Sequence, residues 1–176
     1  PMTKEAFKEM VTVDQPEAPD YFVHDAILNR QERPALEESM QLTLKPLDLE
    51  QVLEMQSENA QLVDVRSQLD FAGGYLRGSL NIGLDGKYAT WAGTMLDKNR
   101  PIIVIADPGR EEEAIVRLGR IGFDNVVGYL QDGLNPLQER LELMQKIERI
   151  TARALADRMT AGEQPFIIDV RTESEL

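Results

Sequence analysis

Two pairs of oppositely charged side chains stand in the same short pattern far apart in the sequence. Asp64 and Arg66 close one apolar run, and Asp169 and Arg171 close another 105 positions later, counted from Asp64 to Asp169. A carboxylate beside a guanidinium could act as a catalytic pair in an active site. At the end of a strand, such a pair more often fixes a loop through charge-assisted hydrogen bonds. We therefore expect a structural role for both pairs.

The second candidate site is the loop at residues 106–110, which follows the apolar run at residues 102–105. Consecutive backbone N–H groups at the start of a helix bind anions. Gly109 and Arg110 are therefore candidates for a small-anion site in this loop.

Acidic residues around the loop argue against such a site. Asp107, Glu111, Glu112 and Glu113 would compete for the backbone donors and repel an anion. The alternative is a conventional helix start, with Asp107 as N-cap, Pro108 at the first helical position and glutamates that complement the helix dipole. The sequence favours this alternative.

The chain lacks the residue types that most covalent and metal chemistry needs. It contains no cysteine and a single histidine, His24. Without cysteine it can form no persulfide, no thiolate nucleophile and no thiolate metal ligand. One histidine without ligand partners predicts no metal centre. We expect no catalytic activity, no metal and no cofactor in this chain.

The charge balance limits the classes of partner. The chain has 31 acidic against 19 basic residues and a formal net charge of −12. Phosphate binding requires a basic surface, so nucleic acid and anionic membranes are not expected partners. No apolar stretch approaches the roughly 18 residues of a membrane span, and a chain without cysteine fits a reducing compartment. We expect a cytoplasmic protein.

Short apolar runs alternate with helical patterns from about residue 41 onward, which is typical of α/β proteins. The sequence predicts strands at residues 42–44, 62–65, 80–82, 102–105 and 126–129. It predicts helices at residues 48–56, 68–73, 88–95, 107–121 and 135–147. Continuous apolar strands are typical of sheets covered on both faces. We expect a small, mostly parallel five-stranded sheet flanked by helices on both faces.

The recurring Asp–Arg pattern also indicates two copies of one small α/β unit. In residues 1–40 we expect short helices at 2–11 and 21–30, with too few apolar residues for a core of their own. We expect residues 41–147 to form the complete domain. Residues 148–176 open a second copy with one helix and one strand, too little to offset its ordering entropy. We expect residues 166–170 to be disordered or to pair with another surface as an edge strand, which would also favour a homo-oligomer.

Residues 42–134 resemble the rhodanese homology domain. The resemblance rests on Asp64-Val65-Arg66 at a strand end and on the strand, loop and helix around Ala106. It also rests on residues 74–82, where the family commonly has a Gly-His-Ile-x-Gly-Ala-x-Asn-Ile motif. The family carries its sulfur on a cysteine in that loop, and here Ala106 occupies the position of the nucleophile.

Further segments narrow the resemblance. Residues 88–93, 104–108 and 121–129 resemble the first, cysteine-less rhodanese domain of proteins that fuse a metallo-β-lactamase-fold persulfide dioxygenase to two rhodanese domains. Residues 18–22 and 28–30 look like the tail of the metallo-hydrolase domain. On this resemblance, residues 1–40 are that tail with a linker, and residues 148–176 are the truncated start of the second rhodanese domain.

The resemblance implies a parent enzyme that oxidises a low-molecular-weight persulfide at a non-haem iron and transfers sulfur through a downstream cysteine. The iron, or zinc, is expected only in the missing metallo-hydrolase domain. For this chain it implies a non-catalytic scaffold whose partners are the preceding metallo-hydrolase domain and the following rhodanese domain. The alternatives are a module that binds or senses thiosulfate or sulfite, and a regulatory adaptor unrelated to sulfur metabolism.

Overall fold

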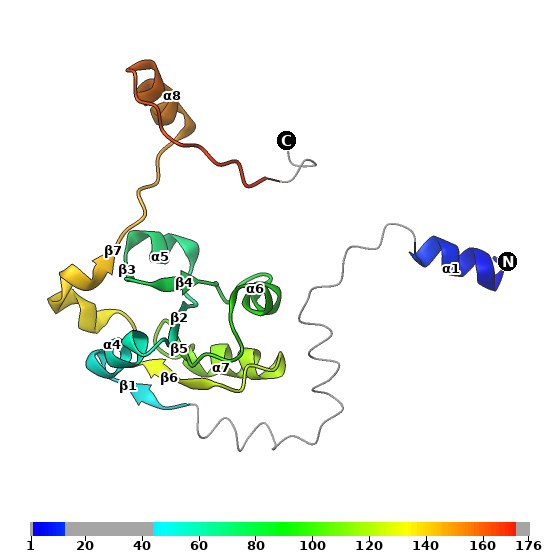
Figure 1. Cartoon of the computed structure of the whole chain (residues 1–176), viewed down its shortest axis with the longest axis horizontal. Coiled ribbons are helices and arrows are strands. Elements are labelled where there is room, and N and C mark those ends of the chain that lie inside the picture. Colours follow the sequence, from blue (N-terminus) through cyan, green and yellow to red (C-terminus); the bar gives the residue numbers. More distant parts are fainter. Residues whose placement is uncertain (1, 13–43, 172–176) are drawn as a thin grey trace. The chain divides into compact units, whose positions relative to one another are not determined.

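The computed structural model describes residues 2–12 and 44–171 of the chain. It divides into two compact units, residues 1–146 and residues 147–176, which are drawn in Figure 1. Helix α1 (Lys4–Thr12) lies where the sequence predicts a helix at residues 2–11. The helix predicted at residues 21–30, His24 and the segments at residues 18–22 and 28–30 lie outside the described residues.

A five-stranded sheet forms the centre of the first unit (Figure 1). Its strands are β1 (Pro46–Leu47), β2 (Gln61–Asp64), β4 (Ser79–Asn81), β5 (Ile102–Ile105) and β6 (Val126–Leu130). They lie in the order β1-β6-β5-β2-β4, and each neighbouring pair is parallel. The expected α/β class with a five-stranded sheet is thus confirmed, and the sheet is parallel throughout.

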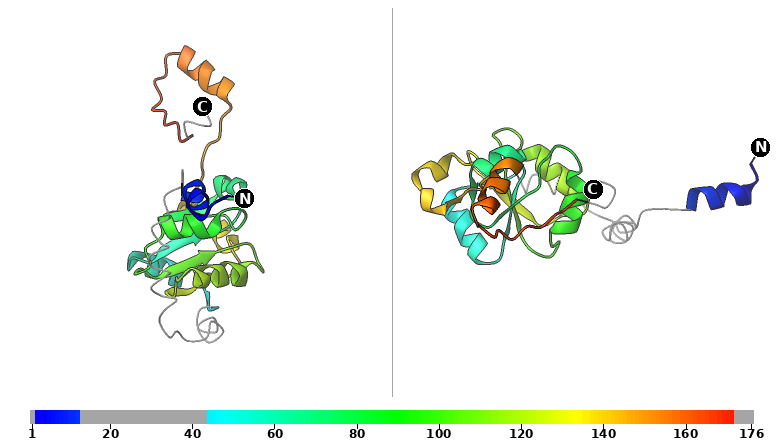
Figure 2. Two further views of the ribbon diagram at one scale, coloured as in Figure 1. Left: turned by 90° about the vertical axis from the view of Figure 1, so that its right-hand side faces the viewer. Right: turned by 90° about the horizontal axis from the view of Figure 1, so that it is seen from above.

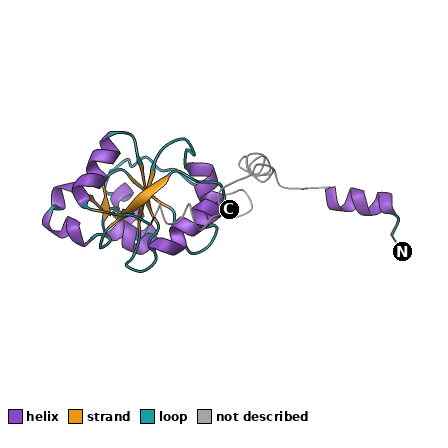
Figure 3. Ribbon diagram, turned by 90° about the horizontal axis from the view of Figure 1, so that it is seen from below, coloured by secondary structure: helices purple, strands orange, loops and turns teal. Residues whose placement is uncertain are grey.

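Helices cover this sheet on both faces, as predicted. They are α4 (Leu49–Ser57), α5 (Gln68–Gly73), α6 (Tyr88–Met95) and α7 (Glu111–Arg120). Figure 3 shows the strands enclosed by helices, and Figure 2 gives two further views of the same layers. The sheet has a hydrophobic core on each face. Strand β5 contributes side chains to both cores, because successive side chains of a strand point to opposite faces.

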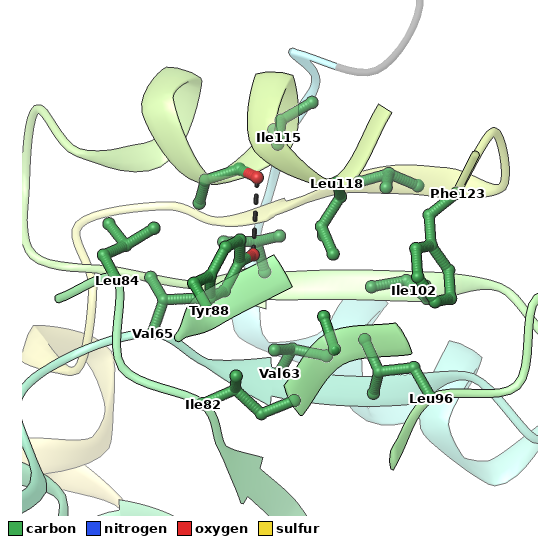
Figure 4. Close-up of a cluster of buried hydrophobic side chains, with 14 of the residues drawn as sticks. Val63, Val65, Ile82, Leu84, Tyr88, Leu96, Ile102, Ile115, Leu118 and Phe123 are labelled. Atoms are coloured by element: carbon green, nitrogen blue, oxygen red, sulfur yellow. Dashed lines mark hydrogen bonds between the residues drawn. The ribbon is translucent and has the colours of Figure 1, made fainter. Parts of the chain in front are cut away.

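On one face, Ile102 and Val104 pack in a buried cluster with side chains of α6 and α7, several of which are labelled in Figure 4. On the other face, Ile103 and Ile105 pack in a second cluster with side chains of α4. All four side chains are fully buried, which accounts for the uninterrupted apolar run in the sequence.

Local sequence signals account for the starts of the two helices on either side of β2. The Asp48 side chain accepts a hydrogen bond from the Gln51 N–H at 2.8 Å, and the Gln51 side chain accepts one from the Asp48 N–H at 3.0 Å. This reciprocal arrangement is a capping box. At α5, the Ser67 hydroxyl accepts from the Asp70 N–H at 3.2 Å. Both helices therefore begin within a residue of the predicted positions.

The helix predicted at residues 135–147 is wrong. This segment contains two 3-10 helices, η1 (Asn135–Glu139) and η2 (Leu141–Leu143), followed by strand β7 (Met144–Gln145). Strand β7 pairs antiparallel with β3 (Tyr75–Leu76), and the Arg77 N–H donates to the Leu143 carbonyl at 2.9 Å. These long-range hydrogen bonds take the place of the local hydrogen bonds of an α-helix. Leu137 is fully buried in this segment.

The first predicted strand is displaced along the chain. Leu44 has no strand conformation, and the rest of the predicted range 42–44 lies outside the described residues. Strand β1 begins instead at Pro46, and its Leu47 side chain is buried. Bonds from the Tyr129 N–H to the Lys45 carbonyl and from the Gln131 N–H to the Leu47 carbonyl hold it beside β6.

The second unit contains helix α8 (Ala152–Thr160). The Thr151 hydroxyl caps this helix by accepting from the Ala154 N–H at 3.1 Å. Residues 163–171 have no regular secondary structure, and none of the α8 side chains is fully buried. Within residues 2–12 and 44–171, no helix is long and apolar enough to cross a lipid bilayer.

Candidate functional site

A cavity of about 730 Å³ lies at the carboxyl ends of β2, β4 and β5. Its wall comprises residues 65–69 after β2, Asn81 at the end of β4, residues 82–87 after it, Trp91 of α6, and Asp107 and Arg110 after β5. Ligand sites of open parallel sheets form at this edge, because the loops that follow the strands meet there. The cavity is therefore the candidate site of the first unit.

Arg66 lines this cavity, and its guanidinium pairs with the buried Asp64 carboxylate. The Arg66 Nη2 donates to Asp64 Oδ2 at 2.7 Å, and Arg66 Nε donates to Oδ1 at 3.0 Å. The guanidinium also donates to the Gly74 carbonyl at 2.8 Å, while the Asn81 amide donates to the Asp64 and Arg66 carbonyls. The pair thus joins the loop that follows β2 to the end of β4 and to the end of α5.

Burial governs the electrostatics of this pair. Asp64 is completely inaccessible to solvent, and the Arg66 side chain is 10% exposed. Burial raises the pKa of the Asp64 carboxyl above its ordinary value because it removes water from the charged form. The hydrogen bonds and charge of Arg66 act in the opposite direction.

The loop at residues 106–110 differs from the predicted helix start. Helix α7 begins at Glu111 rather than Asp107, and no side chain caps it. Asp107 is therefore not the N-cap, and Pro108 is not the first helical residue. Instead, the Arg110 N–H donates to the Asp107 carbonyl at 3.0 Å and closes a turn that contains Gly109 at a φ of +88°. This left-handed conformation is accessible to glycine and interrupts a helix.

Side chains of α7 already occupy the donors that an anion would need. The Gly109 N–H donates to Glu111 Oε2 at 2.7 Å. The Arg110 guanidinium donates to Glu113 Oε2 at 2.7 and 3.1 Å and lies 3.8 Å from Asp85 Oδ1. The competition predicted for Glu111 and Glu113 is therefore present, and it uses both candidate anion-binding residues. Of these two, Arg110 lines the cavity and Gly109 does not.

Ala106, which the resemblance assigns to the position of the nucleophile, is closed off from solvent. It is 1% exposed, and the loop after β6 lies against its carbonyl oxygen. A Cβ atom on Gly133 would lie 2.9 Å from that oxygen, which is closer than a side chain tolerates. Gly133, at a φ of +58°, permits this close approach.

Tyr88 fixes α6 against α7 beside the cavity. Its hydroxyl donates to the Ala114 carbonyl at 3.3 Å, as drawn in Figure 4. The Arg117 guanidinium lies 4.9 Å from the centre of the Tyr88 ring and donates to the Leu84 carbonyl at 2.6 Å. Burial raises the pKa of the Tyr88 phenol far above its ordinary value. These contacts hold the loop after β4 in place.

The sequence interpretation missed several residues of the cavity wall. Lys87 and Asp85 bring charge from the loop after β4, and Trp91 is 56% exposed at the rim. Tyr88 and Trp91 lie three positions apart in α6, but only Tyr88 is buried. The position of these residues just after a strand was the available signal, because loops at the carboxyl edge line such sites.

The second pair repeats the local geometry of the first. Arg171 Nη2 donates to Asp169 Oδ2 at 2.6 Å, and its Nε donates to Oδ1 at 3.0 Å. Both side chains are about half exposed, and they belong to the second unit. The hydrogen bonds from Arg171 lower the pKa of the Asp169 carboxyl, in contrast with the buried Asp64.

The wall of the cavity carries polar and charged side chains but no thiol. The chain has no cysteine, and in the described part of the chain no three His, Cys, Asp or Glu side chains gather as a possible metal site. The polar groups of the wall are the Ser67 hydroxyl, two amides, a lysine, two arginines and two aspartates, beside the aromatic ring of Trp91.

Several solved structures have a similar fold. The Alr3790 protein from Anabaena sp. is 22% identical, with a TM-score of 0.51, over 63% of this chain and 99% of that chain. The metallo-beta-lactamase from Staphylococcus aureus subsp. aureus COL is 24% identical, with a TM-score of 0.53, over 73% of this chain. EanB is 16% identical, with a TM-score of 0.51, over 74% of this chain.

These likenesses establish the fold and no more. This chain spans 35% of the length of the S. aureus protein and 35% of EanB, and no curated protein matches it. A family model described as the rhodanese-like domain matches residues 48–140, the region that contains the cavity and every strand of the sheet except β1. Because this match covers more than half of the 176 residues, the chain belongs to the rhodanese-like domain family.

Proposed function

We propose that this chain is a non-catalytic rhodanese-like docking module of a larger cytoplasmic enzyme that oxidises sulfide-derived persulfides. The observation that carries the non-catalytic part is the loop after β5. Ala106 replaces the sulfur carrier there, and the Glu111 carboxylate occupies the Gly109 N–H at 2.7 Å. A thiosulfate or persulfide anion would have to displace that carboxylate against the charge of Glu112 and Glu113.

Sequence resemblance and one structural likeness support the rest of the proposal. Residues 18–22 and 28–30 look like the tail of a metallo-hydrolase domain, and a metallo-beta-lactamase structure matches 73% of this chain. The recurring Asp169 and Arg171 suggest a second rhodanese-like domain on the other side. A rigid module between two active domains would raise the effective concentration of one site at the other. Iron or zinc would be bound by the metallo-hydrolase domain.

The docking role is tested in a protein that contains both neighbouring domains. Residues 41–146 are replaced by a flexible linker of matched reach, and persulfide oxidation is measured with and without the sulfur-transfer step. We expect each separate activity to persist and the coupled turnover to fall. Unchanged coupled turnover would reject the docking role.

The non-catalytic assignment has a direct test on this chain. We expect Ala106→Cys to give no thiosulfate:cyanide sulfurtransferase activity, because the new thiol would lie at a buried position beside donors already bound to carboxylates. The control is Ala106→Ser, which has similar size and no sulfur. Turnover by Ala106→Cys above that of Ala106→Ser would show that the loop still holds an anion.

The second candidate function is the binding of thiosulfate or sulfite in the cavity. Lys87 favours it, because this side chain lines the cavity and has no ion pair within the described residues. Titration of the chain with thiosulfate or sulfite, followed by amide chemical shifts, discriminates the two functions. Shifts around residues 85–91 that vanish in Lys87→Gln would support binding, and no shifts at millimolar anion would remove it.

The third candidate is a regulatory adaptor unrelated to sulfur metabolism. The coding sequence on either side of this chain distinguishes it from the docking module. A His-rich metal motif upstream and a cysteine-bearing loop downstream would support the fusion. Their absence would favour the adaptor.

A further inference from the structure

One face of α6 is exposed although the helix packs on the sheet. Tyr88 and Leu96 point into the core (Figure 4), whereas Trp91 is 56% exposed and Met95 is 50% exposed. Trp91 and Met95 are four positions apart and therefore lie side by side on the helix surface. Large apolar side chains exposed together mark a surface for another protein, and tryptophan is enriched among the residues that contribute most to such contacts.

A charged side chain stands at each end of this face. Lys87 immediately precedes α6, and Asp97 follows the C-cap residue Leu96. Both charged residues are exposed, and neither forms an ion pair with any other residue that the structure describes. The face therefore has a basic end, an apolar centre and an acidic end.

These two charges oppose the dipole of their own helix. The N-terminus of a helix carries a partial positive charge and its C-terminus a partial negative one, so Lys87 and Asp97 each stand at the unfavourable end. Helix α6 has no acidic residue in its first turn and no basic residue in its last turn to compensate. An antiparallel neighbouring helix removes the conflict, because its negative end lies beside Lys87 and its positive end beside Asp97.

A second copy of this chain supplies such a helix. A two-fold axis perpendicular to α6 makes the two copies of the helix antiparallel, and every contact then occurs twice. Trp91 and Met95 of one copy pack on the same two side chains of the other. Lys87 of each copy faces Asp97 of the other, so opposite charges meet at both ends of the apolar contact.

We propose that α6 forms the contact of a two-fold homodimer, in which Trp91 and Met95 pack across the axis between two Lys87–Asp97 ion pairs. A second copy fits this face better than a partner of uniform charge, because the face has one basic and one acidic end. This inference does not depend on the proposed function in sulfur oxidation.

Sedimentation velocity of the whole chain tests the inference. In about 0.15 M salt, a Debye length of about 8 Å screens the long-range repulsion between two copies of net charge −12. We expect the sedimentation coefficient to rise between micromolar and submillimolar protein. The emission of Trp91, the only tryptophan of the chain, should shift to shorter wavelength over the same concentrations.

Two substitutions at exposed side chains locate the contact. Trp91→Ala should stay monomeric at every concentration and keep the urea midpoint of the original chain, because the ring is not part of the core. Leu141→Ala, at a side chain of η2 that is 68% exposed, is the matched control and should dimerise as the original chain does.

A charge exchange tests the antiparallel arrangement. Lys87→Glu and Asp97→Lys should each raise the dimer dissociation constant about tenfold, because each dimer contains two such exposed pairs. The double variant restores opposite charges and should return the constant to within about threefold of the original value. Asp97→Asn, which keeps an acceptor for the Asn99 N–H, is the second variant in case Asp97→Lys loosens that turn.

Three outcomes would overturn the inference. The first is a chain that stays monomeric up to submillimolar concentration, and the second is a Trp91→Ala variant that still dimerises. The third is a charge exchange in which the double variant is as weak as the single variants, or in which neither substitution of Asp97 weakens the dimer.

Discussion

At the scale of single residues, burial decides the behaviour of two chemically identical pairs. The hydrogen bonds within the pair are the same in Asp64–Arg66 and Asp169–Arg171, yet the pKa of Asp64 is raised and the pKa of Asp169 is lowered. Desolvation has the largest effect on the pKa of Asp64, whereas the hydrogen bonds from Arg171 have the largest effect on the pKa of Asp169. The same pair is therefore a core element in one unit and a surface element in the other.

Removal of the two carboxylates should separate these roles. Asp64→Ala leaves the Arg66 guanidinium nearly buried without its partner, so we expect a loss of roughly 3–5 kcal/mol in the free energy of unfolding. Asp169→Ala, at a solvent-exposed pair, is the matched control and should leave the free energy of unfolding unchanged. Urea denaturation of the whole chain measures both, and equal effects would contradict the contrast in burial.

Tyr88 should make the fold sensitive to alkaline pH. The unfolded phenol loses its proton near its ordinary pKa of about 10, while burial keeps the folded phenol protonated to higher pH. The folded state then binds more protons, so the free energy of unfolding falls as pH rises above about 10.

The variant Tyr88→Phe tests this linkage. Because this variant lacks the hydrogen bond to Ala114, its free energy of unfolding at neutral pH should be lower by roughly 0.5–1.5 kcal/mol. Above pH 10 its free energy of unfolding should fall less steeply than that of the original chain. Urea titrations from neutral to alkaline pH measure both effects, with Tyr75→Phe as the control. A decline in Tyr88→Phe as steep as in the original chain would refute the role of Tyr88.

At the scale of elements, close backbone approaches set where strands and helices can lie. Gly128 in β6 has a φ of +154°, and a Cβ there would lie 2.5 Å from the Lys45 carbonyl oxygen and 2.9 Å from the Leu47 side chain. Strand β1 can therefore pair with β6 only because residue 128 is a glycine. At Gly109 no atom lies close, and the left-handed backbone conformation of this residue places the start of α7 at Glu111.

Gly128→Ala should weaken the edge of the sheet. We expect the free energy of unfolding to fall by about 1–3 kcal/mol, because the substitution adds backbone strain and a steric clash with β1. Gly73→Ala is the control, since a Cβ at the end of α5 meets no atom within 4 Å and should be neutral or stabilising. Thermal melts of both variants provide the measurement; a stable Gly128→Ala would contradict the close approach.

At the scale of the whole molecule, composition determines which partners are accessible. The net charge of −12 repels polyanions, and the arginines of the cavity wall are engaged by carboxylates of the same unit. The two compact units differ in how much apolar surface they bury. A complete five-stranded sheet encloses two cores in the first unit, whereas the second unit leaves Phe166 and Val170 open.

The charge leads to a prediction about nucleic acid. We expect no binding of a short DNA duplex at micromolar concentration in low salt, because no basic surface offsets the repulsion. Fluorescence anisotropy of a labelled duplex provides the measurement, with a basic DNA-binding protein as the positive control. A salt-dependent rise in anisotropy would contradict the prediction.

Local patterns in the sequence were sufficient for most of the sheet and for several helices. The apolar runs of β2, β5 and β6 and the helices α5 and α6 could be predicted, because periodicity and capping residues act over a few positions. The absence of cysteine also determined, without any structure, that this chain carries no sulfur on a thiol. The repeated Asp–Arg pattern predicted two local clamps of one design.

Only the tertiary structure decided features that depend on distant segments. Residues 135–147 have helical periodicity, yet pairing with β3 makes their end a strand, because long-range hydrogen bonds replace local ones. The occupation of the Gly109 N–H by Glu111 and the opposite pKa shifts of Asp64 and Asp169 depend on turn geometry and on burial. Sequence spacing specifies neither, since both arise from how the chain packs in space.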